Sequence, residues 1–151
     1  MHHTRLRIID EELGLYIEDV FDASQIVVKR EDRDGSLYRL VTYLDTVLHG
    51  PSLYYGKEGI LLSSSWFCRG VREGKTRMYY PNGRLYALEG FVQGQREGAH
   101  RYYDREGTLR TLLNYKKGAL EGDMEIYSAE GSLKRKTSFS QGKIKELFHV
   151  S

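Results

Sequence analysis

The sequence has almost no cysteine and no long apolar run. Cys68 is the only cysteine among 151 residues, so neither an intramolecular disulfide nor a cysteine-based zinc site can form. A lone thiol is typical of a reducing compartment. No apolar stretch approaches the ~20 residues that cross a bilayer, and the N-terminus lacks the apolar core of a signal peptide. These absences predict a cytoplasmic protein without membrane insertion.

Proline and net charge are also scarce, with two prolines and a formal charge of +2. A charge this small does not indicate a nucleic-acid partner. It is unevenly distributed, because residues 1–25 carry two arginines against six carboxylates, a net −4 that leaves +6 on residues 26–151. A basic group follows near the C-terminus: Lys134, Arg135, Lys136, Lys143 and Lys145. We interpret it as a solvated face that also protects a sheet edge.

Glycine and tyrosine, at 16 and 12 residues, are abundant, and their positions reveal a repeat of 24 residues. One glycine recurs at Gly35, Gly59, Gly83, Gly107 and Gly131, and a leucine follows two residues later in each unit. Further columns in the same phase are Gly50, Gly74, Gly98, Gly122 and Tyr55, Tyr79, Tyr103, Tyr127. The predicted units are residues 26–49, 50–73, 74–97, 98–121 and 122–146 of a repeat domain, 26–151. Several columns in phase exclude coincidence.

Each unit has the pattern of a β-hairpin, with an aromatic-rich strand, a turn and a return strand. The turn of the third unit is Pro81-Asn82-Gly83, but the residue before the glycine is acidic in four of the five units. Glutamate is unfavourable in the type I′ turn of a two-residue loop. We therefore expect a type I turn followed by a left-handed glycine that closes a β-bulge. At the second turn, Glu73, Glu97 and Glu121 recur beside glycine, which we interpret as turn chemistry.

Alternation along the strands divides the columns between two faces of the sheet. We expect the Tyr55, Leu61 and Phe67 columns, which recur in every unit, on a constant packing face. The opposite face changes from apolar to polar toward the last unit, as in a capping repeat. Its apolar members are predicted to form one partner-binding surface: Tyr54, Leu62, Trp66, Met78, Tyr86, Leu88, Val92 and Tyr102. Either a partner or residues 1–25 would cover this set, and the sequence leaves both open.

Residues 1–25 do not follow the repeat and are predicted to be an N-terminal capping segment. Leu13 and Asp19 fall in phase with two of the columns, but no glycine turn accompanies them. The apolar residues of the segment fit one stripe of a short helix equally well: Leu13, Tyr16, Ile17, Val20 and Phe21. The secondary structure of the segment stays open.

The repeating unit resembles the bacterial MORN-variant repeat. Its pattern is Gly-x4-Tyr-x3-Gly-x-Leu-x5-aromatic-x2-Gly-x3-Gly, and the third copy matches it best, from Gly74 through Tyr79, Gly83, Leu85 and Phe91 to Gly98. The resemblance covers about residues 26–146. It implies an elongated antiparallel β-meander of stacked hairpins. Such proteins are often labelled antitoxins of the YwqK type, and others are secreted effectors or scaffolds. The eukaryotic motif Tyr-x-Gly-x-Trp is absent, so lipid binding is not carried over.

Three patterns that suggest ligand chemistry are better explained otherwise. Gly70–Thr76 resembles a phosphate-binding loop but has three residues between glycine and Gly-Lys where that loop has four, and both glycines belong to the repeat. The histidines do not assemble a zinc site, since His49 and His100 occupy different columns. No nucleophile, base and orienting residue can be combined from the columns. We therefore predict no catalytic residues, no metal and no cofactor.

The sequence thus predicts a non-enzymatic, all-β repeat protein that binds another protein through one face of its sheet, as a monomer or a weak homo-oligomer. Trp66, Tyr86, Tyr54 and Tyr102 are the expected anchors, because aromatic residues dominate interface energetics. The alternatives are an antitoxin that neutralises a toxin, a chaperone or adaptor for a secreted protein, and a platform for a glycan or peptide.

Overall fold

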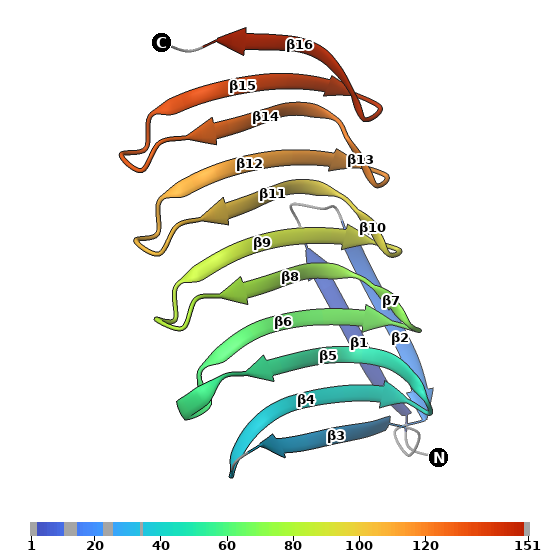
Figure 1. Ribbon diagram of the computed structural model, residues 1–151. Coiled ribbons are helices and arrows are strands. Elements are labelled where there is room, and N and C mark those ends of the chain that lie inside the picture. The colour runs from blue at the N-terminus through green and yellow to red at the C-terminus, as the bar shows by residue number, and fades with distance from the viewer. Residues whose placement is uncertain (1–2, 11–14, 23–25, 34, 150–151) are drawn as a thin grey trace.

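The protein is an elongated antiparallel β-meander. The computed structural model describes residues 3–10, 15–22, 26–33 and 35–149, and within these ranges it consists of strands and one short 3-10 turn, η2 (Lys57–Gly59). A sheet of 14 strands runs in chain order from β3 to β16, and β1 with β2 forms a separate two-stranded sheet. Figure 1 shows the strands stacked in sequence order along the long axis. The all-β meander of stacked 24-residue hairpins predicted from the sequence is confirmed.

Each unit contributes an outgoing and a return strand. The outgoing strands are β3 (Ile26–Arg33), β5 (Val47–Tyr55), β8 (Gly74–Tyr79), β11 (Gly98–Tyr103) and β14 (Gly122–Tyr127). The return strands are β4 (Ser36–Leu44), β6 (Leu61–Cys68), β9 (Leu85–Val92), β12 (Leu109–Lys116) and β15 (Leu133–Ser140). Three two-residue strands follow the short turns: β7 (Val71–Arg72), β10 (Gln95–Arg96) and β13 (Ala119–Leu120). The chain ends in β16 (Lys143–His149), an edge strand on β15 that the repeat pattern did not predict.

The longer turn of each hairpin ends in a left-handed glycine. In the third unit the Gly83 N–H donates to the Tyr80 carbonyl at 2.9 Å, the Tyr80 N–H donates to the Arg84 carbonyl at 2.9 Å, and Gly83 has φ +87°. The same bonds recur at 104–108 and 128–132. These turns confirm the prediction. The second unit differs, because there Glu58 itself takes φ +62° within η2.

A β-bulge accompanies this turn in the register of every hairpin. In the third unit Met78 pairs with Ala87 but Tyr79 pairs with Leu85, so Tyr86 has no residue opposite it. One extra residue on the return strand shifts the alternation of its side chains between the two faces of the sheet by one. Residues beyond the bulge therefore point to the face opposite the one that uninterrupted alternation would give. The bulge therefore decides which columns share a face.

From the second unit to the fifth, the shorter turns have two consecutive left-handed residues, the signature of a type I′ turn. The second is always glycine, with φ from +81° at Gly94 to +91° at Gly70. The first is a residue with a side chain, and its φ lies between +48° and +51°: Arg69, Gln93, Lys117 and Gln141. Such a backbone is strained for these residues, so the turns need support from outside.

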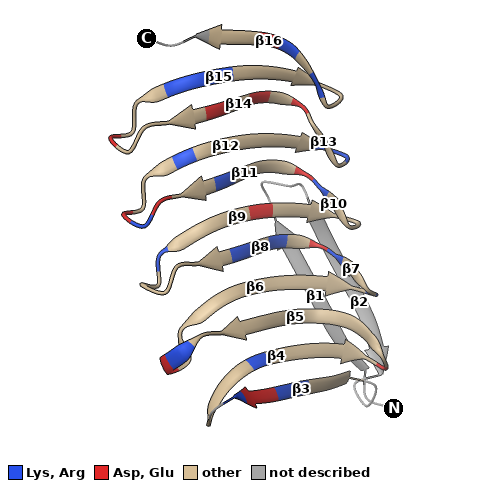
Figure 2. Cartoon of the chain, in the orientation of Figure 1, with Lys and Arg blue, Asp and Glu red and all other residues tan. Residues whose placement is uncertain are grey.

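That support comes from the preceding unit, whose side chain accepts the backbone N–H of the strained residue. Glu73 accepts from Gln93 at 2.8 Å, and the pairs Glu97–Lys117 and Glu121–Gln141 repeat the bond at 2.7 Å. Nδ1 of His49 takes the same role toward the Arg69 N–H at 2.9 Å. The glutamates appear as red segments just before β8, β11 and β14 (Figure 2). The prediction of turn chemistry for them is confirmed.

The N-terminal hairpin consists of β1 (His3–Asp10) and β2 (Leu15–Asp22), paired from His3↔Asp22 to Asp10↔Leu15. The strands exclude a helix over residues 15–22, which was one of the two alternatives; Leu13 lies outside the described residues. The hairpin runs obliquely behind the sheet (Figure 1), and Cα atoms of β1 and β8 approach within 8 Å. One face of the early units thus has a second layer.

The turn support gives a direct prediction. Glu97→Ala removes the acceptor for the Lys117 amide and should lower the free energy of unfolding by about 1–2 kcal/mol, since a turn or cap bond of this kind contributes that much. Hydrogen exchange should accelerate most at the Lys117 amide. Glu97→Gln keeps an acceptor and should lose less. Glu106→Ala, at an exposed turn position, is the matched control. Unchanged protection of Lys117 in Glu97→Ala would contradict the support role.

Candidate interaction surface

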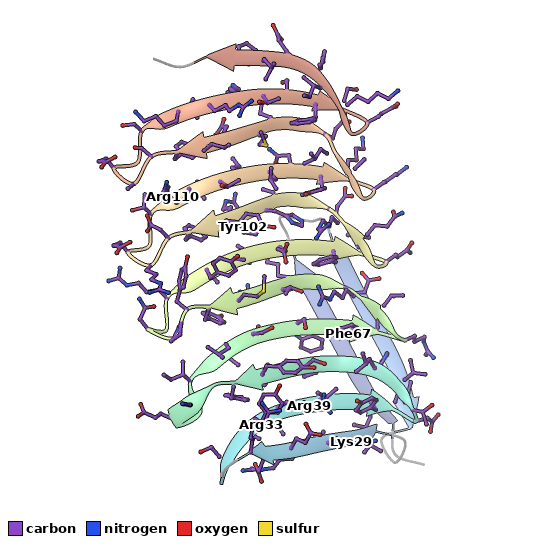
Figure 3. All side chains as sticks on the ribbon, viewed as in Figure 1. Lys29, Arg33, Arg39, Phe67, Tyr102 and Arg110 are labelled. Atoms are coloured by element: carbon purple, nitrogen blue, oxygen red, sulfur yellow. The ribbon has the colours of Figure 1, made fainter. Side chains whose placement is uncertain are left out.

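The strand register assigns side chains to two faces of the sheet. Directly opposed residues share a face, and the register joins Gly50 to Phe67, Ser52 to Ser65 and Tyr54 to Ser63. The equivalent positions of each unit lie on the same side, which we call the open face. The side chains of Phe67, Tyr102 and Arg39, labelled in Figure 3, belong to it. The opposite side, with Pro51, Trp66 and Leu88, is the covered face, because the N-terminal hairpin lies behind it (Figure 1).

The eight residues predicted as one binding surface are divided between these faces. Tyr54, Met78 and Tyr102 lie on the open face. Trp66, Leu88 and Val92 point to the covered face, where Trp66 pairs with Pro51 and Leu88 with Arg77. Leu62 and Tyr86 occupy the bulges. Leu62 lines a hollow of about 430 Å³ with Tyr38 and Tyr55 at the long-turn edge, and Tyr86 packs edge-on against Tyr80 and Tyr102.

The prediction that these eight residues share a face is therefore wrong, and so is the prediction of one constant face for the Tyr55 and Phe67 columns. Tyr55 is adjacent to Tyr54 on its strand and points to the other side. The physical reason is the bulge: Leu62 is unopposed, and this one residue inverts the relation between the outgoing strand and the far end of the return strand. Whether any of the eight residues binds a partner stays a prediction.

The middle of the open face is a row of buried polar side chains. Its members come from the centres of the outgoing and return strands: Ser52, Ser65, Thr76, Glu89, His100 and Thr137. His100 is completely buried and Ser52 is 3% exposed. Ala87, also completely buried, lies beside this row. Since no described element covers this face, the burial comes from larger side chains on both sides of the row. We call the strip of the open face above this row, between those larger side chains, the groove, and the row its floor.

Two rims flank this groove. The rim toward the long turns carries Tyr54, Met78, Tyr102 and Ile126. The rim toward the short turns carries one aromatic ring from each of the second to fifth units, opposite a glycine on the outgoing strand of the same hairpin: Phe67, Phe91, Tyr115 and Phe139. Arg72 lies over Phe67 and Phe91, and Arg96 lies over Tyr115 at 5.6 Å from the ring centre. The second rim is therefore aromatic and positively charged.

A hydrogen-bonded cluster holds the centre of the groove. The Tyr102 hydroxyl donates to Glu89 at 2.6 Å, and Nδ1 of His100 lies 3.8 Å from the same carboxylate oxygen. Nε2 of His100 lies within hydrogen-bond distance of the Gly90 backbone, and its ring packs 4.6 Å from the Tyr115 ring. The pKa of Glu89 is lowered to about 2, first by His100 and then by the Tyr102 hydroxyl, against the effect of burial. Burial, followed by the bond to Glu89, raises the pKa of Tyr102.

The floor retains unused hydrogen-bonding capacity. The hydroxyls of Ser52 and Thr137 are buried and have no hydrogen-bond partner, whereas Nδ1 of His100 faces the Glu89 carboxylate. A buried polar group without a partner is unfavourable by about 1–3 kcal/mol. Two such groups in one row are consistent with a ligand that completes the bonds. The sequence analysis did not identify these residues, although Ser52, Thr76 and His100 occupy one polar column among apolar neighbours.

The described residues were compared with the requirements of a metal-binding cluster and of a membrane-spanning helix. They contain no group of three or more His, Cys, Asp or Glu side chains that could hold a metal ion. Within the same ranges no helix has the length and apolar character to cross a bilayer. The polar groups of the groove are hydrogen-bonding groups with buried surroundings, and their arrangement suits recognition of a ligand.

Comparison with known families agrees with the architecture. Residues 72–92 and 96–117 match the model of the MORN repeat variant, so two adjacent units carry this repeat. The matches span β8–β9 and β11–β12, the units that contain Glu89, His100 and Tyr102. No curated protein matches the chain.

The lowered pKa of Glu89 predicts an acid-sensitive centre. The stabilisation from its charge is complete above the unfolded pKa near 4.5 and is lost as the pH falls toward 2. Glu89→Gln should therefore lower the free energy of unfolding at neutral pH by on the order of 2 kcal/mol and reduce its pH dependence between pH 4.5 and 2. Urea unfolding followed by Trp66 fluorescence measures both, with Glu106→Gln as the control. A parallel pH dependence in Glu89→Gln and the native protein would disprove the assignment.

Proposed function

We propose that this protein is a non-enzymatic interaction module whose open-face groove binds an extended segment of another protein. Residues 26–151 form the binding domain in this proposal, and residues 1–25 form a cap that backs the covered face. The observation that carries the proposal is the floor of the groove. Its buried hydroxyls with free hydrogen-bonding capacity lie between two rims of large side chains, which is the arrangement of a pocket core surrounded by anchors.

The dimensions of the groove favour an extended chain as the ligand. The groove crosses the strands from β4 to β15, a distance of about 40 Å at roughly 4.8 Å per strand. A segment of about 12 residues spans this distance at roughly 3.3 Å per residue. Such a segment can place polar groups on the floor and alternate side chains against the two rims. The repeating spacing of the rim residues supports a ligand that is itself regular.

The two rims also set the chemistry of the partner. Tyr54, Met78 and Tyr102 offer aromatic and flexible apolar contacts, the residue types enriched at interface cores. Arg72 and Arg96 are exposed on the opposite rim, and no carboxylate of the described residues forms an ion pair with either. A partner segment that combines apolar and acidic side chains would satisfy both rims. The antitoxin and the chaperone or adaptor roles are versions of this binding with different partners.

Position-specific photo-crosslinking tests the proposal. A photoreactive benzoylphenylalanine at Met78, on the long-turn rim of the groove in the third unit, should give a covalent adduct with a partner protein in cells of the native host. The same residue at Arg77, one position away on the covered face, is the matched control and should give none. Mass spectrometry of the adduct identifies the partner and distinguishes a toxin from a secreted client.

Two further positions make the result decisive. The photoreactive residue at Tyr54 and at Tyr102 should each crosslink the same partner, because both lie on the rim with Met78. Adducts of one protein from all three positions would agree with a segment that follows the groove. If none of these positions gives a protein adduct while the variants are folded, the open face does not bind a protein and the proposal fails.

A further inference from the structure

The groove contains a hollow where the first and second units meet. This hollow of about 290 Å³ opens on the open face. Ser52 and Ser65 lie on its floor and Tyr43, Tyr54 and Phe67 form its walls, with Arg72 at one side. The hollow is built from β4, β5, β6 and β7. It therefore combines hydroxyl donors, aromatic walls and a guanidinium within one small volume.

The hydroxyl of Ser52 is an unsatisfied hydrogen-bonding group in this hollow. The Ser52 side chain is 97% buried, being 3% exposed, and its hydroxyl has no hydrogen-bond partner. Ser65, opposite it in the register, is 4% exposed. Nothing in the folding of the sheet requires a hydroxyl at Ser52, because alanine or valine would fill the position without an unsatisfied group. A ligand that accepts its hydrogen bond would account for the serine.

The charge of the hollow indicates an anion with a single charge. Arg39 lines the hollow but is held by Glu31, with Nη2 3.1 Å from Oε1. Arg72 has no carboxylate partner among the described residues and is instead positioned by Phe67 and Phe91, whose ring centres lie 5.9 and 5.2 Å from its guanidinium. One uncompensated cation matches a carboxylate, whereas a phosphate monoester carries a charge of about −1.5 to −2.

We propose that this hollow receives a carboxylate of the bound segment, from an Asp or Glu side chain or from a C-terminus, with Arg72 as its ion-pair partner and Ser52 as a hydrogen-bond donor. This rests on the proposed function and specifies the anchor of that ligand. Guanidinium and hydroxyl donors make charge-assisted bonds to carboxylates, which are about twice as strong as neutral ones. The aromatic walls fit apolar neighbours of the acidic residue.

Peptide titrations followed by NMR of the ¹⁵N-labelled full chain test this site. The probes are acetyl-Phe-Glu-Phe-amide, its neutral match acetyl-Phe-Gln-Phe-amide, acetyl-Phe-Phe with a free C-terminus, and phenyl phosphate. The glutamate peptide or the free C-terminus should shift the amides of Ser52, Ser65 and Arg72, and the comparison of the two identifies the source of the carboxylate. The neutral peptide should bind about tenfold more weakly.

Two variants separate binding from folding. Ser52→Ala should weaken the carboxylate probe about tenfold, while its thermal unfolding midpoint stays the same or rises, because the removed hydroxyl has no partner in the free protein. Arg72→Gln should weaken it by a similar factor. Arg77→Gln, on the covered face, is the matched control and should leave binding unchanged.

Three outcomes would overturn the carboxylate site. These are equal binding of the neutral peptide, tighter binding of phenyl phosphate, and unchanged affinity in both Ser52→Ala and Arg72→Gln. The crosslinking experiment is independent of them. If Met78 crosslinks a partner but the hollow rejects carboxylates, the interaction function stands and the anchor is wrong. If the hollow binds carboxylates but no protein adduct forms, the anchor site stands and the protein partner is wrong.

Discussion

A side-chain hydrogen bond ties each type I′ turn of this sheet to the preceding unit: a side chain of that unit accepts a backbone N–H from the turn. The donor residues Arg69, Gln93, Lys117 and Gln141 have left-handed backbones that are unfavourable for residues with side chains. Their amides point out of the ladder toward the preceding unit and need an acceptor. The constant period of 24 keeps every donor beside its acceptor. An insertion in any unit would move the donor away from its acceptor and leave both a strained turn and an unpaired amide.

The period itself was readable from the sequence, and so was the type of the longer turn, because a glycine marks the left-handed position at its end. The left-handed Arg69, Gln93, Lys117 and Gln141 of the shorter turns have no such mark in the sequence. The roles of Glu73, Glu97 and Glu121 did follow from their place beside recurring glycines. The edge strand β16 did not, since Lys143–His149 lacks the glycine of the next unit. The strands of the N-terminal hairpin were one of two alternatives that apolar spacing over so short a segment could not separate.

The arrangement of the faces shows where prediction from sequence failed. A bulge was expected in each hairpin. Its effect is to change the face to which side chains point along the whole return strand, and the prediction did not take this effect into account. When the bulge residue is included in the alternation, Trp66 and Leu88 lie on the side of Pro51. When it is left out, they are assigned to the side of Tyr54. The groove floor was missed for another reason. Burial of Ser52, Thr76 and His100 depends on the height of neighbouring rims in three dimensions, and polar residues in a strand ordinarily indicate a solvated face.

The direction of the turn support has a consequence for biogenesis. The acceptor always precedes the donor in the chain, from His49 to Arg69 through Glu121 to Gln141. A polypeptide leaves the ribosome N-terminus first, at roughly 5–20 residues per second. Each new turn therefore emerges beside a unit that already carries its acceptor, and the next 24 residues can be added onto a completed template. The units can therefore be added from the N-terminal end, in the same direction in which the chain is synthesised.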